Sequence, residues 1–154
     1  MEYAIQVEHV DGRPLAVVRR RASSQELKDV VPQACGIVWG VMKTLQVQGL
    51  GRHVAIYWDG EINLEVGVEV TTPFTGHDEV IGSATPAGTV ATTAHFGPYD
   101  RLHEAHTAIC QWCADNGHTL AGPNWEVYGH RTDDPAKLRT DVFYLLNATS
   151  DGTG

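Results

Sequence analysis

Hydrophobic and polar residues alternate over several short stretches, and a period of two predicts β-strands with one buried face. The alternating segments are 3–10, 14–22, 53–59, 62–70, 88–96, 124–130 and 140–146. Two other segments, 32–48 and 100–117, repeat their apolar residues every three or four positions, which predicts helices. The first of these helices is expected to begin at Pro32, because proline is tolerated at the first helical position and not in the interior.

Turn-forming residues separate these elements. Asp59 and Gly60 predict a hairpin between the third and fourth strands. The loop 71–79 lies near the middle of the chain, where it could connect two halves. Gly36 and Gly40 lie four residues apart on one face of the first helix, and we expect them to let another backbone or a ligand come close.

The order of the elements, β-β-α-β-β and then β-α-β-β, indicates one unit used twice. The stretch HVAIYW resembles NWEVYG when Tyr57 is aligned with Tyr128, 71 positions later. We therefore predict an α+β fold, a tandem pseudo-two-fold repeat of β-β-α-β-β units. Its antiparallel sheet would carry two main helices and leave a central ligand groove. Residues 1–148 would form one domain with halves of about 1–75 and 80–148, followed by a flexible tail, 149–154.

The composition of the chain limits which partners it is expected to bind and in which cellular compartment it is expected to occur. The formal net charge is −8, so phosphate backbones are repelled, and Arg19, Arg20 and Arg21 form the one basic cluster, at a strand end. No apolar run approaches the roughly 20 residues of a membrane span. We therefore predict no direct nucleic-acid partner and no membrane partner. Three cysteines without a basic, apolar leader indicate a cytoplasmic protein.

Glu126 is a carboxylate in the middle of an otherwise aromatic and apolar strand. Alternation places Glu126 and Tyr128 on one face and Trp125 and Val127 on the other. A charge on a half-buried strand is costly unless something pairs with it. Glu126 therefore faces water, or has a partner inside the protein, or meets a ligand.

A series of possible metal ligands, His103, His106, Cys110 and Cys113, follows one face of the second helix. The series spans about 15 Å, which is too long for four ligands on one ion. We predict no metal site, and we expect Cys110 or Cys113 to be a small core residue. The sequence contains no nucleophile elbow, phosphate-binding glycine loop or dinucleotide fingerprint, so no cofactor is predicted.

Three motifs in order carry a resemblance to a known family. They are Gly97-Pro98-Tyr99, then Ala105 and Trp112, then Gly122-Pro123 with Glu126 and Tyr128. This arrangement resembles the GyrI-like (gyrase-inhibitor-like) small-molecule-binding domains, which also form the effector-binding part of several drug-responsive transcription activators. The resemblance covers about residues 3–147, without a helix-turn-helix, and so implies the stand-alone form.

Two positions depart from the family pattern. His106 stands where relatives often have tryptophan or tyrosine, and this change could alter the pocket. Glu69 stands where proline is common, and we expect it to alter only a strand edge.

The resemblance implies that Glu126 lies at the floor of the pocket, where it meets cationic ligands as an unpaired acceptor among rings. The other implied or suggested ligand-binding residues are Tyr128, Tyr57, Tyr99, Trp39, His106 and Phe96. The alternative is structural, with Glu126 satisfied by the hydroxyl group of Tyr57, Tyr99 or Tyr128. A tyrosine hydrogen bond and a ligand role could coexist.

Three functions remain open. The first is a small-molecule binding domain for aromatic, amphipathic and often cationic ligands, in sensing, sequestration or resistance, as a monomer or homodimer. The second is a hydrolase of cyclopropane-bearing or similar electrophilic toxins, with Glu126 and Tyr128 as catalytic residues. The third is a protein-binding inhibitor of the gyrase-inhibitor type. The same residues serve the first two, so the sequence does not separate them.

Overall fold

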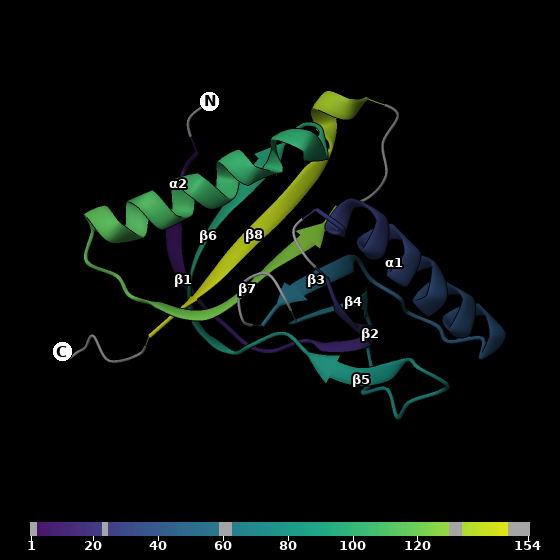
Figure 1. Cartoon of the computed structure of the whole chain (residues 1–154). Coiled ribbons are helices and arrows are strands. Elements are labelled where there is room, and N and C mark those ends of the chain that lie inside the picture. The colour runs from purple at the N-terminus through teal and green to yellow at the C-terminus, as the bar shows by residue number, and fades with distance from the viewer. Residues whose placement is uncertain (1–2, 23–24, 59–62, 130–133, 148–154) are drawn as a thin grey trace. The chain divides into compact units, whose positions relative to one another are not determined.

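The computed structural model describes residues 3–22, 25–58, 63–129 and 134–147 (Figure 1). The contacts between residues divide the chain into two compact units. Unit A is Gly12–Thr85, and unit B is Met1–Asp11 together with Pro86–Gly154. The Asp59-Gly60 turn and the tail 149–154 lie outside the described residues.

Unit A consists of one helix and a four-stranded antiparallel sheet. Its elements are β2 (Pro14–Arg21), α1 (Leu27–Thr44), β3 (His53–Tyr57), β4 (Asn63–Glu69) and β5 (Ile81–Ala84). The strands lie in the order β3-β4-β2-β5. The helix lies against β2 and β4 and buries Ala34, Val38 and Met42, which follow its predicted apolar stripe.

Unit B also has one α-helix and four strands, together with two short 3-10 helices. They are β1 (Gln6–Val10), β6 (Gly88–Phe96), the short 3-10 helix η1 (Tyr99–Arg101), α2 (Leu102–Asp115), β7 (Leu120–Tyr128), a second 3-10 helix η2 (Pro135–Lys137) and β8 (Arg139–Leu146). The antiparallel order is β1-β6-β8-β7. In Figure 1, α2 lies along β6 and β8. It buries Leu102, Ala105, Ile109 and Cys113 against the sheet residues Ala91, Val142 and Leu146.

The predicted α+β fold with antiparallel strands and two main helices is confirmed. Tyr57 ends β3 opposite Leu64 of β4, and Tyr128 ends β7 opposite Thr140 of β8, so the two tyrosines occupy equivalent positions in the two units. One strand in each unit comes from a distant part of the sequence. β1 precedes unit A in the chain and pairs with β6, whereas β5 pairs with β2. The division into one domain with two sequential halves stays a prediction.

The strand β5 was missed because its sequence, IGSA, is short and contains a glycine, which weakens the pattern of a strand. The structure gives the reason for this glycine. A Cβ atom at Gly82 would lie 2.0 Å from the carbonyl oxygen of Phe74. The loop backbone at Phe74 therefore packs so closely on β5 that position 82 requires glycine. A residue with a side chain at this position would have made the strand pattern recognisable.

The predicted start of α1 is wrong, because the helix begins at Leu27 and Pro32 lies inside it. Pro32 is still within the first two turns, where proline removes one intrahelical hydrogen bond, and the rest of the helix is held by packing. The expected close approach of another backbone at Gly36 and Gly40 is also wrong, whereas the close approach of a ligand stays a prediction. Among the described residues, and apart from the helix's own backbone, no heavy atom lies within 4 Å of a Cβ built at either glycine.

Within the described part of the chain, neither helix combines the length and the apolar character needed to cross a membrane.

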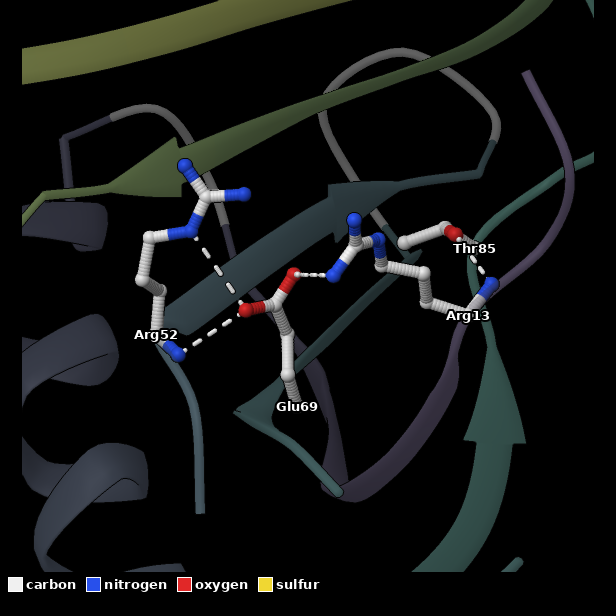
Figure 2. Close-up of polar contacts among 4 residues, drawn as sticks. All are labelled: Arg13, Arg52, Glu69 and Thr85. Atoms are coloured by element: carbon white, nitrogen blue, oxygen red, sulfur yellow. Dashed lines mark hydrogen bonds and ion pairs between the residues drawn. The ribbon is translucent and has the colours of Figure 1, made fainter. Parts of the chain in front are cut away.

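Glu69 has a larger role than the strand-edge change expected for it, because β4 lies between β3 and β2. Its side chain is only 11% exposed and lies between Arg52 and Arg13 (Figure 2). The Arg52 backbone N–H donates to Glu69 Oε1 over 2.9 Å, and the Arg52 Nε is 3.4 Å from the same oxygen. Arg13 Nη1 is 3.7 Å from Oε2, and the Arg13 backbone N–H donates to Thr85 Oγ1. This carboxylate therefore ties the chain segment before β3 to the end of β4.

Replacement of Glu69 by alanine is expected to lower the free energy of unfolding by about 1.5–3 kcal/mol, because a buried backbone N–H loses a charged acceptor. The matched control is Glu79→Ala. Glu79 pairs with Arg20 over 3.0 Å with half of its side chain exposed, so its loss should cost less than about 1 kcal/mol. Urea denaturation measures both values. Equal losses in the two variants would show that the buried contacts of Glu69 do not stabilise unit A.

Candidate functional site

The alternation of β7 places Glu126 and Tyr128 on one face, as the sequence predicted, and the structure shows that this face is the one toward α2. Glu126 is 6% exposed and pairs in register with Val142, which belongs to the core beneath α2. Trp125 lies on the opposite face, 2% exposed, and its ring stacks on Phe143 with centroids 5.3 Å apart. Trp125 and Glu126 therefore lie on opposite faces of the strand, as the alternation predicted, and Glu126 is a buried carboxylate on the helix side of the sheet.

Glu126 is hydrogen-bonded to two side chains of unit B. The Tyr128 hydroxyl donates to Glu126 Oε1 over 2.5 Å, and His106 Nε2 lies 2.6 Å from Glu126 Oε2. The expectation of an unpaired acceptor is therefore wrong. The reason is geometric: Tyr128 is two residues further along the same face of β7, and α2 packs on that face with His106 turned toward the strand.

The chain of hydrogen bonds continues beyond His106 to β8. His106 Nδ1 lies 2.7 Å from the Tyr144 hydroxyl, and the two rings meet edge to face with centroids 5.5 Å apart. An ionised carboxylate only accepts hydrogen bonds, so His106 Nε2 carries a proton. Three elements of unit B therefore contribute to one polar chain, Tyr144–His106–Glu126–Tyr128, and the rings of Tyr128 and Tyr144 also pack against the hydrophobic core.

Tyr99 extends the cluster of rings on the other side of Tyr128. The two rings meet edge to face with centroids 5.7 Å apart, and Tyr99 is 52% exposed. The corner before Tyr99 needs Gly97, whose φ of 128° is unfavourable for other residues. Among the rings of this cluster, Tyr99 is therefore the one most open to an incoming molecule.

A buried histidine holds this corner in place. His95 is 1% exposed, and its Nε2 lies 3.0 Å from the Pro98 carbonyl oxygen. A carbonyl only accepts, so Nε2 carries the proton and Nδ1 accepts a hydrogen bond from the Tyr3 hydroxyl over 2.8 Å. Burial raises the pKa of Tyr3, with a further contribution from Glu104, so its hydroxyl stays a donor.

The structure does not bring every predicted ligand-binding residue to Glu126. Phe96 follows His95 on β6 and lies on the opposite face of the sheet, 49% exposed, beneath the Arg139 guanidinium at 5.6 Å. We therefore no longer assign Phe96 to this site. Tyr57 and Trp39 belong to unit A, where Tyr57 is buried and Trp39 is exposed next to His53. Their role in ligand binding stays a prediction.

The equivalent positions of unit A contain no such polar chain. The strand register places Ala55 where unit B has Glu126, since Ala55 pairs with Val66 as Glu126 pairs with Val142. Val38 and Met42 of α1 match Ile109 and Cys113 of α2 by the same 71-residue offset, which puts Cys35 at the position of His106. Burial raises the pKa of Cys35 to about 11, so this thiol stays neutral.

The possible metal ligands on α2 separate into different environments. Cys113 is 1% exposed in the core, as expected, and burial raises the pKa of its thiol. His106 belongs to the polar chain, whereas His103 is exposed. Among the described residues, no group of three or more histidine, cysteine or carboxylate side chains could hold a metal ion.

Two cavities lie away from Glu126. One, of about 590 Å³, is in unit A and is lined by the three arginines of β2 together with Trp58 and Glu65. The other, of about 500 Å³, is in unit B and includes Phe96, Arg139 and Phe143 on the sheet face opposite α2. Neither cavity includes a residue of the polar chain. The Glu126 cluster is therefore the candidate site because of its chemistry, a buried carboxylate among aromatic rings, and not because of a cavity.

Tyr144, His95 and Tyr3 were not recognised from the sequence as part of this cluster. Alternation along β8 puts Val142 and Tyr144 on one face, and this was the available signal. No signal in the sequence indicated that the Tyr3 hydroxyl would reach His95, 92 positions away.

Solved structures share this fold over nearly the whole chain. The C-terminal domain of EcmrR has 23% identity and a TM-score of 0.79, covering 97% of this chain and 100% of that one. SAV2435, solved with tetraphenylphosphonium bound, has 17% identity and a TM-score of 0.64, covering 96% and 95%. A hydrolase from Listeria innocua has 10% identity and a TM-score of 0.61, covering 93% and 91%. At these identities the likeness establishes the fold alone.

Among curated proteins, none matches this sequence significantly. The family model for the GyrI-like small molecule binding domain matches residues 3–146, which is almost the full length. The three motifs around Tyr99, Trp112 and Glu126 fall within this range, as does the polar chain built on Glu126. The chain therefore belongs to the GyrI-like small molecule binding domain family.

Proposed function

We propose that the chain binds aromatic or amphipathic cations at the cluster formed by Glu126, His106, Tyr128, Tyr144 and Tyr99, in sensing or sequestration. The observation that carries this proposal is the burial of one carboxylate among aromatic rings of a small-molecule binding domain. The binding of tetraphenylphosphonium by SAV2435, a protein of the same fold, is consistent with this ligand class.

Electrostatics supports a cationic ligand. A buried carboxylate interacts with an opposite charge more strongly than an exposed one does, because little water screens the pair. Aromatic faces add cation–π attraction of about 0.5–2 kcal/mol each. Tyr128 presents such a ring beside Glu126, and the half-exposed ring of Tyr99 packs against Tyr128.

The proposal is tested by replacing Glu126 with glutamine, which keeps the shape and removes the charge. The affinity for tetraphenylphosphonium should fall by about 1.5–3 kcal/mol, roughly 10- to 150-fold, the value of a charged interaction in a buried site. The affinity for triphenylphosphine oxide, which is neutral, should change much less. Isothermal titration calorimetry measures both.

The matched control is Glu104→Gln, which removes one carboxylate from the same unit. Glu104 is paired with Arg101 at 3.0 Å away from the polar chain, so cation affinity should stay close to that of the parent. If Glu126→Gln binds both ligands as tightly as the parent, Glu126 is structural and the proposal is wrong. Catalytic turnover of a strained cyclopropane electrophile by the parent, lost in Glu126→Gln, would instead support the hydrolase.

A further inference from the structure

His106 occupies an unusual position in the polar chain, because it is in direct contact with the carboxylate that the proposed function assigns to cations. Its side chain is 21% exposed, compared with 8% for Glu126. The distance of 2.6 Å between His106 Nε2 and Glu126 Oε2 is that of a charge-assisted hydrogen bond. The imidazole is therefore placed as a counter-ion to Glu126 whenever it is protonated.

The network accommodates both protonation states of His106 without rearrangement. Nε2 donates to Glu126 in either state. Nδ1 meets the hydroxyl of Tyr144, which can donate to a neutral imidazole or accept from an imidazolium. The pair with Glu126 therefore exists either as carboxylate with imidazolium, with no net charge, or as carboxylate with imidazole, with one negative charge.

The other titratable and charged groups of unit B do not replace this pair. Besides Glu126, those on the elements around His106 include Tyr128 on β7, Arg139, Asp141 and Tyr144 on β8, His95 on β6, Tyr99 and Arg101 in η1, and His103, Glu104, Cys110, Cys113 and Asp115 on α2. Asp141 is paired with Arg139 over 2.8 Å. Glu104 is paired with Arg101, and both ring nitrogens of His95 are engaged. In the part of the chain that the structure describes, Glu126 is the carboxylate within hydrogen-bonding distance of His106.

We infer that His106 determines the charge specificity of this site by coupling the binding of a cation to the release of its own proton. A cation beside Glu126 takes over the role of the imidazolium and repels it, so the complex favours the neutral imidazole. A neutral ligand has no such preference and leaves the proton in place. The inference rests on the proposed function, because it concerns the same site and the same class of ligand.

Linkage gives the sign of the pH dependence. Because the cation binds more tightly to the form without the proton, its affinity rises with pH and levels off once His106 is neutral. The slope is at most about tenfold per pH unit, the limit for one exchanged proton. At low pH the site is neutralised by its own histidine, and discrimination between cationic and neutral ligands is smallest.

Calorimetry on the whole chain tests this coupling with tetraphenylphosphonium, a cation with no proton to lose. Titrations between about pH 5 and pH 8, where histidine changes charge, in two buffers of different ionisation enthalpy give the number of protons released. We expect release of up to one proton per cation at the lower pH values, and none with triphenylphosphine oxide. In His106→Gln the release should disappear, and cation affinity at the lowest pH should exceed that of the parent.

The matched control is His103→Gln, three residues earlier on the exposed side of α2, which should release protons as the parent does. Equal proton release by the parent and His106→Gln would overturn the inference, as would cation binding by the parent with no proton release in this range. Absence of cation binding at every pH would overturn the proposed function itself, and the inference with it.

A second measurement, made on the protein without ligand, does not need the His106 variant and therefore tests the inference even if that variant fails to fold. Nitrogen-15 NMR follows the imidazole of His106 in the parent and in Glu126→Gln. Loss of the carboxylate removes the charged acceptor of the Nε2 proton, so the pH dependence of the His106 ring-nitrogen signals should differ between the two proteins. A titration that is the same in both proteins would show that His106 is not the counter-ion of Glu126.

Discussion

Replacement of Gly67 by alanine is expected to remove more than about 3 kcal/mol from the free energy of unfolding, at the upper end of the cost of overpacking. A Cβ atom at this position would lie 1.8 Å from the carbonyl oxygen of Ala16 and 2.7 Å from the Cα atom of Val17. Both are backbone atoms, which cannot rotate away as a side chain can. β4 lies between β2 and β3, so its displacement would break strand pairing on one side or the other.

The control for Gly67 is Gly36→Ala in α1. Among the described residues beyond the helix's own backbone, no heavy atom lies within 4 Å of the added Cβ. Alanine is favoured over glycine in a helix by about 0.8–1 kcal/mol, so this variant should be more stable than the parent. Urea denaturation followed by circular dichroism measures both variants. A Gly67→Ala protein as stable as the parent would show that the two strands separate readily at this point.

The second large effect is expected from Ile109→Ala, which should cost about 2–5 kcal/mol of stability. Ile109 is completely buried between α2 and the sheet of unit B, together with Ala105, Cys113 and Val142. Alanine leaves a cavity that the packed strands close only in part. Because α2 also carries His106, loosening this helix should weaken the binding of tetraphenylphosphonium at temperatures near the midpoint of unfolding.

Two further variants distinguish the loss of core packing from a change in helix propensity. Ile109→Val removes one methylene and should cost about 0.5–1.5 kcal/mol. Gln111→Ala changes an exposed residue of the same helix and should alter stability by less than about 0.5 kcal/mol. Thermal unfolding measured by calorimetry compares the three variants. Equal losses for Ile109→Ala and Gln111→Ala would contradict the assignment of Ile109 to the core.

The parts of the candidate site that could be predicted depend on short-range geometry. Alternation along one strand put Glu126 and Tyr128 on the same face, and it separated them from Trp125. A hydrogen bond between Tyr128 and Glu126 was among the alternatives left open by the sequence, because two residues on one strand face are neighbours in any fold that contains the strand. The motif at Gly97 and Tyr99 was recognised for the same local reason.

The partners that come from other elements could not be predicted. His106, Tyr144 and Glu126 are on α2, β8 and β7, and their distances depend on the packing of a helix on a sheet. The sequence marked His106 as a possible pocket residue but contained nothing that fixed which atom of Glu126 it would meet. Glu69 shows the same limit, because its contact with Arg52 depends on how the segment before β3 lies along β4.

The sequence by itself determined the type and order of most elements, the α+β class and the equivalence of Tyr57 with Tyr128, because these follow from periodicity along the chain. Only the tertiary structure decided that α1 passes through Pro32, that β5 exists, and that β1 and β5 pair with strands distant in the sequence. These features depend on the free energy of packing and of strand pairing between distant segments. That free energy outweighs the local preferences of proline and glycine, and it places His106 against Glu126.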